Sequence, residues 1–250
     1  MYGAIIGDVA GSKYEFLGYK KYPETILDKD CFYTDDTVMT VAVADALTHY
    51  LKPAIIMKGY GRTYKGKGYG SAFQTWLNED NDTPYFSFGN GAAMRVSAAA
   101  WVGKTWAEVI DLATRVTIVT HNHPEGIKGA QATATAIYMA RSGFSKEEIR
   151  DYIEHTFDYD LSSTLDEIRP FYSFNETCQD TVPQAIIAFL ESNSFEDSIK
   201  KAISLGGDAD TLAAITGSIA EAFYGVPDKL IKKVKKFLPE EFIKIVDKIY

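Results

Sequence analysis

The sequence predicts an all-α protein, and three observations support that fold class. Apolar residues recur at the three- and four-residue spacing of helices, and the alternation typical of strands is hard to find. Capping signals precede several apolar segments. The chain has no repeat of fixed period and no low-complexity linker. At 250 residues it is long enough for one domain that buries about three quarters of its unfolded surface. We therefore expect residues 1–250 to form a single compact helical domain.

The first expected helix carries a row of glycines. Gly3, Gly7 and Gly11 share one helical face, although each interior glycine costs about 1 kcal/mol relative to alanine. Close approach of another backbone explains such a row better than chance does. The alternative, that this first segment is a loop, stays open because glycine also interrupts helices.

The later helices are predicted from their boundaries. Residues 37–51 form a helix after an acidic turn, and residues 124–139 form another, in which Pro124 suits the first turn because its missing N–H would be unpaired there. Residues 211–224 precede a glycine that ends the helix, and residues 227–250 have the pattern of two short amphipathic helices. Further helix starts are indicated by Thr105 with Glu108, Ser145 with Glu148, and Ser194 with Asp197.

The stretch of residues 58–70 is the most loop-like part of the sequence. It combines glycines, tyrosines and cationic side chains. A segment of this kind is most often a mobile surface connection. The alternative is that it forms the rim of an entrance for an anionic substrate.

The net charge of −8 argues against a broad nucleic-acid footprint, because phosphate binding needs a concentrated positive face. A small anionic ligand in a local pocket remains compatible with it. Cys31 and Cys178 are too few for a disulfide framework, so we expect free thiols. No basic leader or long apolar run begins the sequence, and Asp8 interrupts the only candidate. We therefore expect no signal peptide, no membrane span and a cytoplasmic location.

Two acidic turns, residues 34–36 and residues 208–211, are the main candidates for chemistry. Each precedes a predicted helix, and each combines two aspartates with a threonine. Aspartate and threonine are also common helix caps, but a cap needs only one side chain, and two adjacent carboxylates repel each other unless a cation neutralises them. Oxygen ligands of this kind suit Mg²⁺ or Mn²⁺, and a pair of ions needs carboxylates from more than one segment. The candidate metal ligands are Thr34, Asp35, Asp36, Asp208, Asp210 and Thr211.

Other metal sites fit the sequence poorly. The acidic positions do not follow the calcium-loop pattern of glycine at the sixth position and glutamate at the twelfth. A prenyl-transferase-type aspartate motif would require an aspartate where Met39 stands. His121 and His123 could hold zinc with the cysteines, but the cysteines lack the paired spacing of zinc sites.

A glycine-flanked turn at Gly89, Asn90 and Gly91 leads into another expected helix. Backbone N–H groups of such a turn can hold a diphosphate, although a lone Gly-Asn-Gly is usually only a turn. The aromatic residues just before it, Tyr85, Phe86 and Phe88, can stack on a base or pack in the core. Glu15 lies seven residues after Asp8, so we expect both on one face of the first helix. Near a metal pair, Glu15 could act as an acid or a proton relay; alone, it would more often be a solvated surface residue.

Taken as a set and in order, these segments resemble the ADP-ribosylglycohydrolase family, the group typified by the dinitrogenase reductase-activating glycohydrolase. The matching stretches are residues 3–8, 14–16, 34–37, 68–70, 89–95, 120–121, 129–130, 181–183 and 206–211, with Phe73 and Trp76. They span nearly the whole chain, and their specificity lies in the combination.

The resemblance implies an orthogonal all-α bundle with a centre of two Mg²⁺ or Mn²⁺ ions. It implies hydrolysis of the glycosidic bond between C1″ of ADP-ribose and an acceptor, often an arginine or serine side chain. The partner would be an ADP-ribosylated protein or a small ADP-ribosyl conjugate. The implied metal ligands fall on Thr34, Asp35, Asp36, Asp208, Asp210 and Thr211, and the implied substrate contacts on Gly89, Asn90, Gly91 and His121.

The catalytic candidates are Asp35, Asp36 and Glu15. Either aspartate could activate a water molecule, while Glu15 could protonate or gate the leaving group; the sequence does not divide these roles. Two other functions remain open: a catalytically silent ADP-ribose-binding or structural relative, and a metal-dependent phosphohydrolase of nucleotides.

Overall fold

Helix α1 (Tyr2–Gly11) runs through the middle of the molecule, and all ten of its residues are buried. The computed structural model describes residues 1–249, and in that range the regular elements are helical apart from one isolated bridge between Gly89 and Thr177. The helices around α1 are α2 (Asp35–Thr48), α3 (Pro53–Thr63), α4 (Ser71–Asn78), α5 (Gly91–Met94), α6 (Ser97–Val102), α7 (Trp106–Thr117), α8 (Pro124–Arg141), α9 (Lys146–Phe157), α10 (Leu165–Ile168), α11 (Cys178–Leu190), α12 (Phe195–Ser204), α13 (Ala209–Tyr224), α14 (Asp228–Val234), the 3₁₀ turn Lys235–Phe237 and α15 (Glu240–Val246). The predicted all-α class is confirmed.

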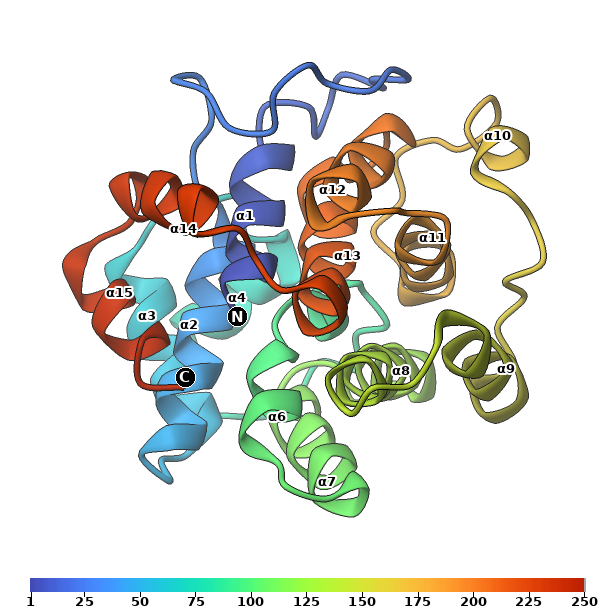
Figure 1. The fold of residues 1–250 in the computed structure, drawn as a ribbon. Helices are drawn as coiled ribbons and strands as arrows, with labels where there is room; N and C mark the ends of the chain where they lie inside the picture. The colour runs from blue at the N-terminus through green and yellow to red at the C-terminus, as the bar shows by residue number, and fades with distance from the viewer. Residues whose placement is uncertain (250) are drawn as a thin grey trace.

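Among the described helices, the most extensive contact is between α1 and α13, which lie next to each other in Figure 1. A Cβ atom on Gly7 would lie 2.0 Å from the carbonyl oxygen of Ala213, and one on Gly3 would lie 2.1 Å from that of Gly217. Only glycine lets the two backbones approach this closely. The interpretation of the glycine row as a contact between backbones is confirmed, and residues 2–11 are a helix rather than a loop.

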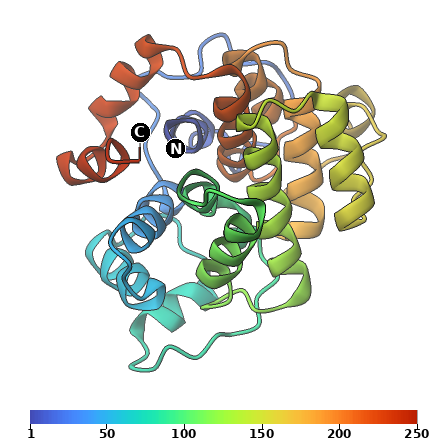
Figure 2. The ribbon, with the colours of Figure 1, turned by 60° about the horizontal axis from the view of Figure 1, so that its bottom comes forward.

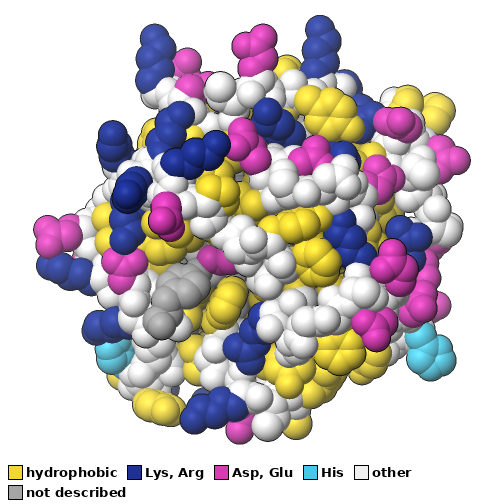
Figure 3. Space-filling view, in the orientation of Figure 1, with side chains coloured by type: hydrophobic (Ala, Val, Ile, Leu, Met, Phe, Trp, Pro, Cys, Tyr) yellow, Lys and Arg dark blue, Asp and Glu magenta, His cyan; other side chains and the backbone are white. Residues whose placement is uncertain are grey.

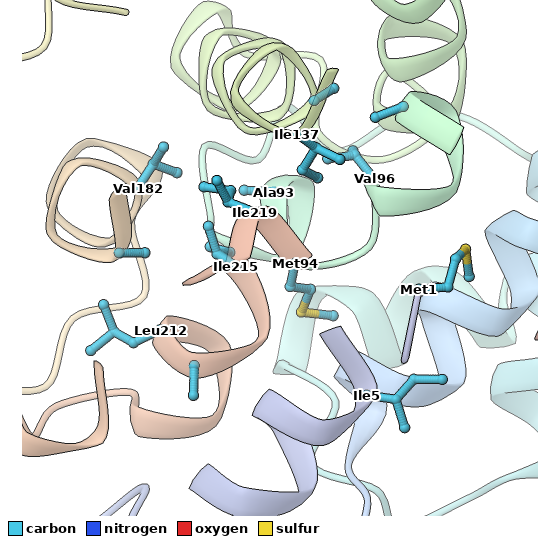
Figure 4. Packing of buried hydrophobic residues seen from close by; sticks show 14 of the residues in the cluster. Met1, Ile5, Ala93, Met94, Val96, Ile137, Val182, Leu212, Ile215 and Ile219 are labelled. Atoms are coloured by element: carbon cyan, nitrogen blue, oxygen red, sulfur yellow. The ribbon is translucent and has the colours of Figure 1, made fainter. Parts of the chain in front are cut away.

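Helix α13 is also the centre of the second half of the fold, where it contacts α8, α11 and α12. Figure 4 shows Ile215 and Ile219 of α13 beside Ala93 of α5, with Ile137 of α8 above them. All four side chains are buried. Figure 2 shows the molecule with the bottom of Figure 1 brought forward, and in this view α8, α9 and α11 lie side by side along one side of the molecule. This packing fixes the start of α13, where the second acidic turn lies.

On the other side of α1, the C-terminal helices α14 and α15 cover α1 and α2 (Figure 1). Phe242 of α15 is fully buried and contacts the rings of Tyr33, Tyr60 and Tyr64. Tyr33 directly precedes the first acidic turn, so this aromatic cluster supports the start of α2. The two predicted tail helices are confirmed as α14 and α15, while Tyr250 lies outside the described residues.

Most predicted helix starts are confirmed by hydrogen bonds. The side chains of Thr105, Ser145 and Ser194 each accept a hydrogen bond from the third residue of their helix, and Ser145 with Glu148 forms a complete capping box. The loop predicted for residues 58–70 is wrong in its first half, because α3 continues to Thr63. The single-domain interpretation of residues 1–250 stays a prediction.

None of the described helices is long and apolar enough to cross a bilayer. On the face drawn in Figure 3, cationic and anionic side chains are interspersed and the cations form no continuous stripe.

Candidate active site and metal centre

The first acidic turn is held by Asp8 of α1, a carboxylate with no exposed surface. Its Oδ2 accepts hydrogen bonds from the backbone N–H groups of Thr34 and Thr37, both at 3.0 Å, and its Oδ1 accepts one from the hydroxyl of Thr34 at 2.7 Å. Thr34 also caps α2 by accepting from the N–H of Asp36. Asp8 therefore orients the turn that carries Asp35 and Asp36.

The second acidic turn depends on two glycines. Gly206 and Gly207 have positive φ angles of 69° and 72°, which favour glycine strongly. The chain can thereby bend between α12 and α13 and bring Asp208 and Asp210 into the interior, where both are buried.

The two turns meet. The hydroxyl of Thr211 donates to Oδ2 of Asp36 at 3.2 Å across 175 residues of sequence. Together with Glu15 and the Gly89–Gly91 turn, both turns open onto one cavity of about 230 Å³. Its lining includes Glu15, Asp35, Asp36, Gly89, Asn90, Gly91, Arg95, His121, Glu176, Asp208, Asp210 and Thr211. Among the predicted site residues only Thr34 is not part of the lining, since its hydroxyl pairs with Asp8 and the N–H of Asp36.

Glu15 reaches this cavity by a route that the sequence did not predict. Helix α1 ends at Gly11, so the expectation that Glu15 shares a helical face with Asp8 is wrong. Glu15 lies instead in a turn after the helix. From there one of its carboxylate oxygens lies within 4.8 Å of carboxylate oxygens of Asp208 and Asp210, and those two also lie within 4.8 Å of each other.

Burial and mutual repulsion make these carboxylates difficult to ionise. Burial, reinforced by Asp8, raises the pKa of Asp35 and of Asp36 well above the usual range. Burial and the charges of Asp208 and Asp36 raise the pKa of Asp210 in the same way. Burial and the charges of Asp208, Asp8 and Glu176 raise the pKa of Glu15 to about 7. Among the described residues that line the cavity, Arg95 is the one basic side chain that stays charged, which is too little positive charge for all the carboxylates to ionise together.

The Gly89–Gly91 turn is fixed from two sides. The side-chain amide of Asn90 donates to Oδ2 of Asp208 at 2.7 Å and to the hydroxyl of Thr181 at 3.1 Å, so Asn90 also orients a predicted metal ligand. The ring of His121 faces the turn, and its Nε2 would lie 3.1 Å from a Cβ atom placed on Gly91. The structure therefore brings all four predicted substrate-binding residues into one place.

The whole chain, residues 1–250, matches the family model described as ADP-ribosylglycohydrolase. The chain belongs to the ADP-ribosylglycohydrolase family. This membership confirms the predicted family and enzyme class.

Relatives and a solved structure agree with the family assignment. The ADP-ribosylarginine hydrolase Tri1 of Pseudomonas putida is 28% identical over 277 residues, which cover 93% of this chain and 72% of that protein. The ADP-ribosylhydrolase ARH3 is 26% identical in Mus musculus and 27% identical in Homo sapiens, in each case over 90% of this chain and 82% or 84% of the relative. A solved ADP-ribosylglycohydrolase-related protein complex matches all of this chain and 94% of its own with a TM-score of 0.80 at 21% identity, which supports the fold.

The residues of this ADP-ribosylglycohydrolase fit a hard divalent cation. Carboxylate and hydroxyl oxygens are the ligands that such ions prefer, and the acidic cluster gathers them from three segments. Oδ1 of Asp36 is buried and has no hydrogen-bond partner among the described residues. An unpaired buried carboxylate oxygen is costly in a folded protein. A bound cation would satisfy it and remove the mutual repulsion.

Three residues that line or support the site were missed as functional candidates. Asp8 organises the first turn, and Arg95 and Glu176 line the cavity. Asp8 and Arg95 lie inside the matching stretches of sequence, so the resemblance pointed to their positions but not to their contacts. No local pattern identifies Glu176, which reaches the cavity because its carbonyl accepts a hydrogen bond from the N–H of Asn90 at 2.7 Å.

Proposed function

We propose that this ADP-ribosylglycohydrolase cleaves the glycosidic bond between C1″ of ADP-ribose and an acceptor, and that it depends on two Mg²⁺ or Mn²⁺ ions. One observation carries the proposal: two acidic turns far apart in sequence and Glu15 open onto a single cavity beside a glycine turn suited to a diphosphate. The proposed ligands are Asp35, Asp36, Asp208, Asp210 and Thr211, which line the cavity, and Thr34, whose hydroxyl would have to turn from Asp8 to reach an ion. Bound there, the ions would hold the vicinal hydroxyls of the distal ribose and neutralise the carboxylates.

The protein's own residues have distinct tasks in this scheme. Hydrolysis of a glycosidic bond passes through an oxocarbenium-like state, so carboxylate charge that the ions do not cancel favours the positive charge that develops at C1″. Asp35 or Asp36 accepts a proton from the attacking water through a carboxylate oxygen. Glu15, in its turn beside Asp208 and Asp210, transfers a proton to the departing acceptor.

The Gly89–Gly91 turn and His121 are proposed to hold the diphosphate. The aromatic residues around the adjoining groove, Phe86, Phe88 and Phe174, are proposed to contact the adenine base. All three are at least 42% exposed and line that groove next to the cavity, as expected for rings that are available for stacking.

The acceptor we favour is an arginine side chain on a protein. Tri1 is named an ADP-ribosylarginine hydrolase. Glu15 and Glu176 add two carboxylates to the lining besides the four aspartates, and a guanidinium complements them in charge. Serine and small ADP-ribosyl conjugates are the alternatives to compare.

A substrate panel tests the proposal. Peptides carrying ADP-ribosylarginine or ADP-ribosylserine, and free ADP-ribose, are incubated with the protein in Mg²⁺, Mn²⁺ or EDTA, and free ADP-ribose, AMP and ribose 5-phosphate are quantified by chromatography. We expect metal-dependent release of ADP-ribose, fastest from the arginine conjugate. Release of AMP and ribose 5-phosphate from free ADP-ribose would instead indicate a nucleotide phosphohydrolase. Binding of ADP-ribose without turnover of any conjugate would indicate a silent relative.

Two variants connect the activity to the cluster. Asp36→Asn and Asp210→Asn each remove one charge at nearly constant volume, and we expect each to lower kcat about a hundredfold or more. Glu240→Gln is the matched control, because that carboxylate is 79% exposed and, among the described residues, its ion-pair partner is Lys244 on the same helix, α15. Full activity in correctly folded aspartate variants would refute the scheme.

A further inference from the structure

Arg95 is a buried cation whose purpose the proposed mechanism leaves open. Only 1% of its surface is exposed, and it forms no ion pair with any described residue. Its Nε has no hydrogen-bond partner there either. The negative charge of Asp35 acts on Arg95 only from beyond ion-pair distance, and a buried charge without a paired countercharge is unfavourable. Arg95 nevertheless lines the active-site cavity, which suggests that its charge serves a ligand or a neighbouring group.

That neighbouring group is His121, reached both directly and through Thr120. Nη2 of Arg95 lies 2.6 Å from the hydroxyl oxygen of Thr120, 3.4 Å from Nδ1 of His121 and 3.4 Å from the backbone carbonyl oxygen of Val116. The same hydroxyl oxygen lies 2.8 Å from Nδ1. Arg95, Thr120 and His121 are all buried, so water does not compete for these contacts.

The directions of these hydrogen bonds follow from the donor inventory. A guanidinium has only donors, so the hydroxyl oxygen of Thr120 accepts from Arg95. The hydroxyl proton of Thr120 can then point to Nδ1 of His121, while the second hydrogen of Nη2 is shared between Nδ1 and the carbonyl oxygen of Val116. With these donors facing Nδ1, we infer that this nitrogen accepts hydrogen bonds and carries no proton.

The other ring nitrogen must then carry the proton of the neutral ring. Burial and, after it, the charge of Arg95 lower the pKa of His121 well below its ordinary value, so the ring is neutral. Nε2 faces the glycine turn, since it would lie 3.1 Å from a Cβ atom on Gly91 and 3.5 Å from one on Gly89. His121 thus presents an N–H donor to the cavity, with the charge of Arg95 behind it.

We propose that Arg95 and Thr120 are positioning residues that fix His121 as the Nε2–H tautomer, so that it donates a hydrogen bond to an anionic oxygen of the substrate's diphosphate at the Gly89–Gly91 turn. This inference rests on the proposed function for the identity of the ligand. The arrangement itself, Arg95 to Thr120 to His121, is independent of it. A donor backed by a buried cation selects an anion over a neutral hydroxyl at this position.

Nuclear magnetic resonance of the wild-type protein in Mg²⁺ tests the arrangement directly. The chain has only four histidines, His49, His121, His123 and His155, so nitrogen-15 labelling of histidine gives a simple spectrum, and His121→Gln assigns the relevant ring. We expect His121 to be neutral, with a proton on Nε2 and none on Nδ1. A proton on Nδ1 would overturn the proposal.

A matched pair of variants tests the consequence for binding. Thr120→Ser keeps the hydroxyl, whereas Thr120→Val keeps the shape and removes it. Calorimetry measures the Kd for ADP-ribose. We expect the Kd of the serine variant to lie within about twofold of wild type and that of the valine variant to be about tenfold higher. The valine variant should also show a proton on Nδ1 of His121. Thermal unfolding checks that both variants are folded, and the spectrum of the wild type still decides the tautomer if the valine variant is not.

The experiments distinguish a failure of this inference from a failure of the proposed function. A proton on Nδ1 in a wild-type protein that binds ADP-ribose would overturn this inference and leave the proposed function standing. Equal affinity of the serine and valine variants would refute the role in binding the diphosphate. A wild-type protein that does not bind ADP-ribose would contradict both the proposed function and the proposed ligand of His121.

Discussion

Replacing Gly7 with alanine would put a methyl group inside the backbone of α13. The new Cβ atom would lie 2.0 Å from the carbonyl oxygen of Ala213, 2.3 Å from its carbonyl carbon and 2.6 Å from the N–H nitrogen of Ala214. Ordinary contact begins at 3.4 Å, and all three atoms are backbone, so no side-chain rotation can relieve the clash. The two central helices would have to move apart.

The size of the change in the free energy of unfolding follows from two opposing effects. Adding atoms to a packed core usually costs about 1–3 kcal/mol and occasionally more; a clash with rigid backbone belongs at the upper end. Alanine recovers about 1 kcal/mol of helix propensity relative to glycine. We therefore expect Gly7→Ala to lower the free energy of unfolding by about 2 kcal/mol or more, which corresponds to a fall in Tm of about 4–8 °C for a chain of this size.

Thermal unfolding followed by circular dichroism measures this effect, with Gly59→Ala as the matched control. Gly59 also lies inside a helix, α3, but a Cβ atom there would meet nothing within 4 Å. The control should therefore be as stable as wild type or up to about 1 kcal/mol more stable. If Gly7→Ala unfolds within a degree of wild type, the glycine row does not hold α1 against α13 in the way described.

Three further outcomes are expected. Asp8→Ala would strand three buried donors on Thr34 and Thr37 and should cost about 3 kcal/mol or more in thermal unfolding; a loss below 1 kcal/mol would contradict the role of Asp8. In EDTA, stability should fall as the pH rises from about 4.5 to 7, because folding raises the pKa of Glu15 from 4.5 to about 7 and this stabilisation is lost as the folded-state group ionises. Mg²⁺ should flatten this slope, and an unchanged slope would count against a metal at the cluster. Cys31 and Cys178 are buried, and burial raises the pKa of Cys178 to about 12. Thiol reagents should therefore modify neither residue at pH 8 until the protein is unfolded. Rapid labelling of the native protein would contradict the burial of these thiols.

The features that the sequence predicted well are encoded locally. A serine or threonine three residues before an acidic side chain satisfies exposed N–H groups within one turn, so Thr105, Ser145 and Ser194 needed no knowledge of the fold. The two acidic turns were also visible locally, because adjacent like charges stand out in any sequence.

Glycine was the least reliable local signal. Its presence in residues 58–70 was interpreted as a loop, yet Gly59 and Gly61 lie within α3. A Cβ atom on Gly61 would lie 2.6 Å from a methyl carbon of Leu77, so that glycine permits close packing and does not end the helix. The same physical property explains Gly3 and Gly7, where periodicity made it recognisable. Without a row at helical spacing, a packing glycine and a loop glycine look alike in sequence.

Local sequence patterns could not predict the positions of residues that are placed by tertiary contacts. Glu15 was expected near the acidic turns because of a helical face shared with Asp8, whereas a turn after α1 brings it close to Asp208. The contacts of Asp8 with residues 34–37 and of Arg95 with residues 120–121 join segments 25 or more residues apart. They form only because the fold brings α1 against the start of α2 and brings Arg95 to the residues that follow α7.

The claim on which everything else depends is that the carboxylates of the two acidic turns form a divalent metal site. Titration of the metal-free protein with Mn²⁺, followed by electron paramagnetic resonance of the free ion, measures this directly. The account predicts saturable binding of two ions per chain in the wild type, loss of at least one site in Asp210→Asn and no loss in Glu240→Gln. The absence of saturable binding to a folded wild-type protein, or equal binding by all three proteins, would contradict it.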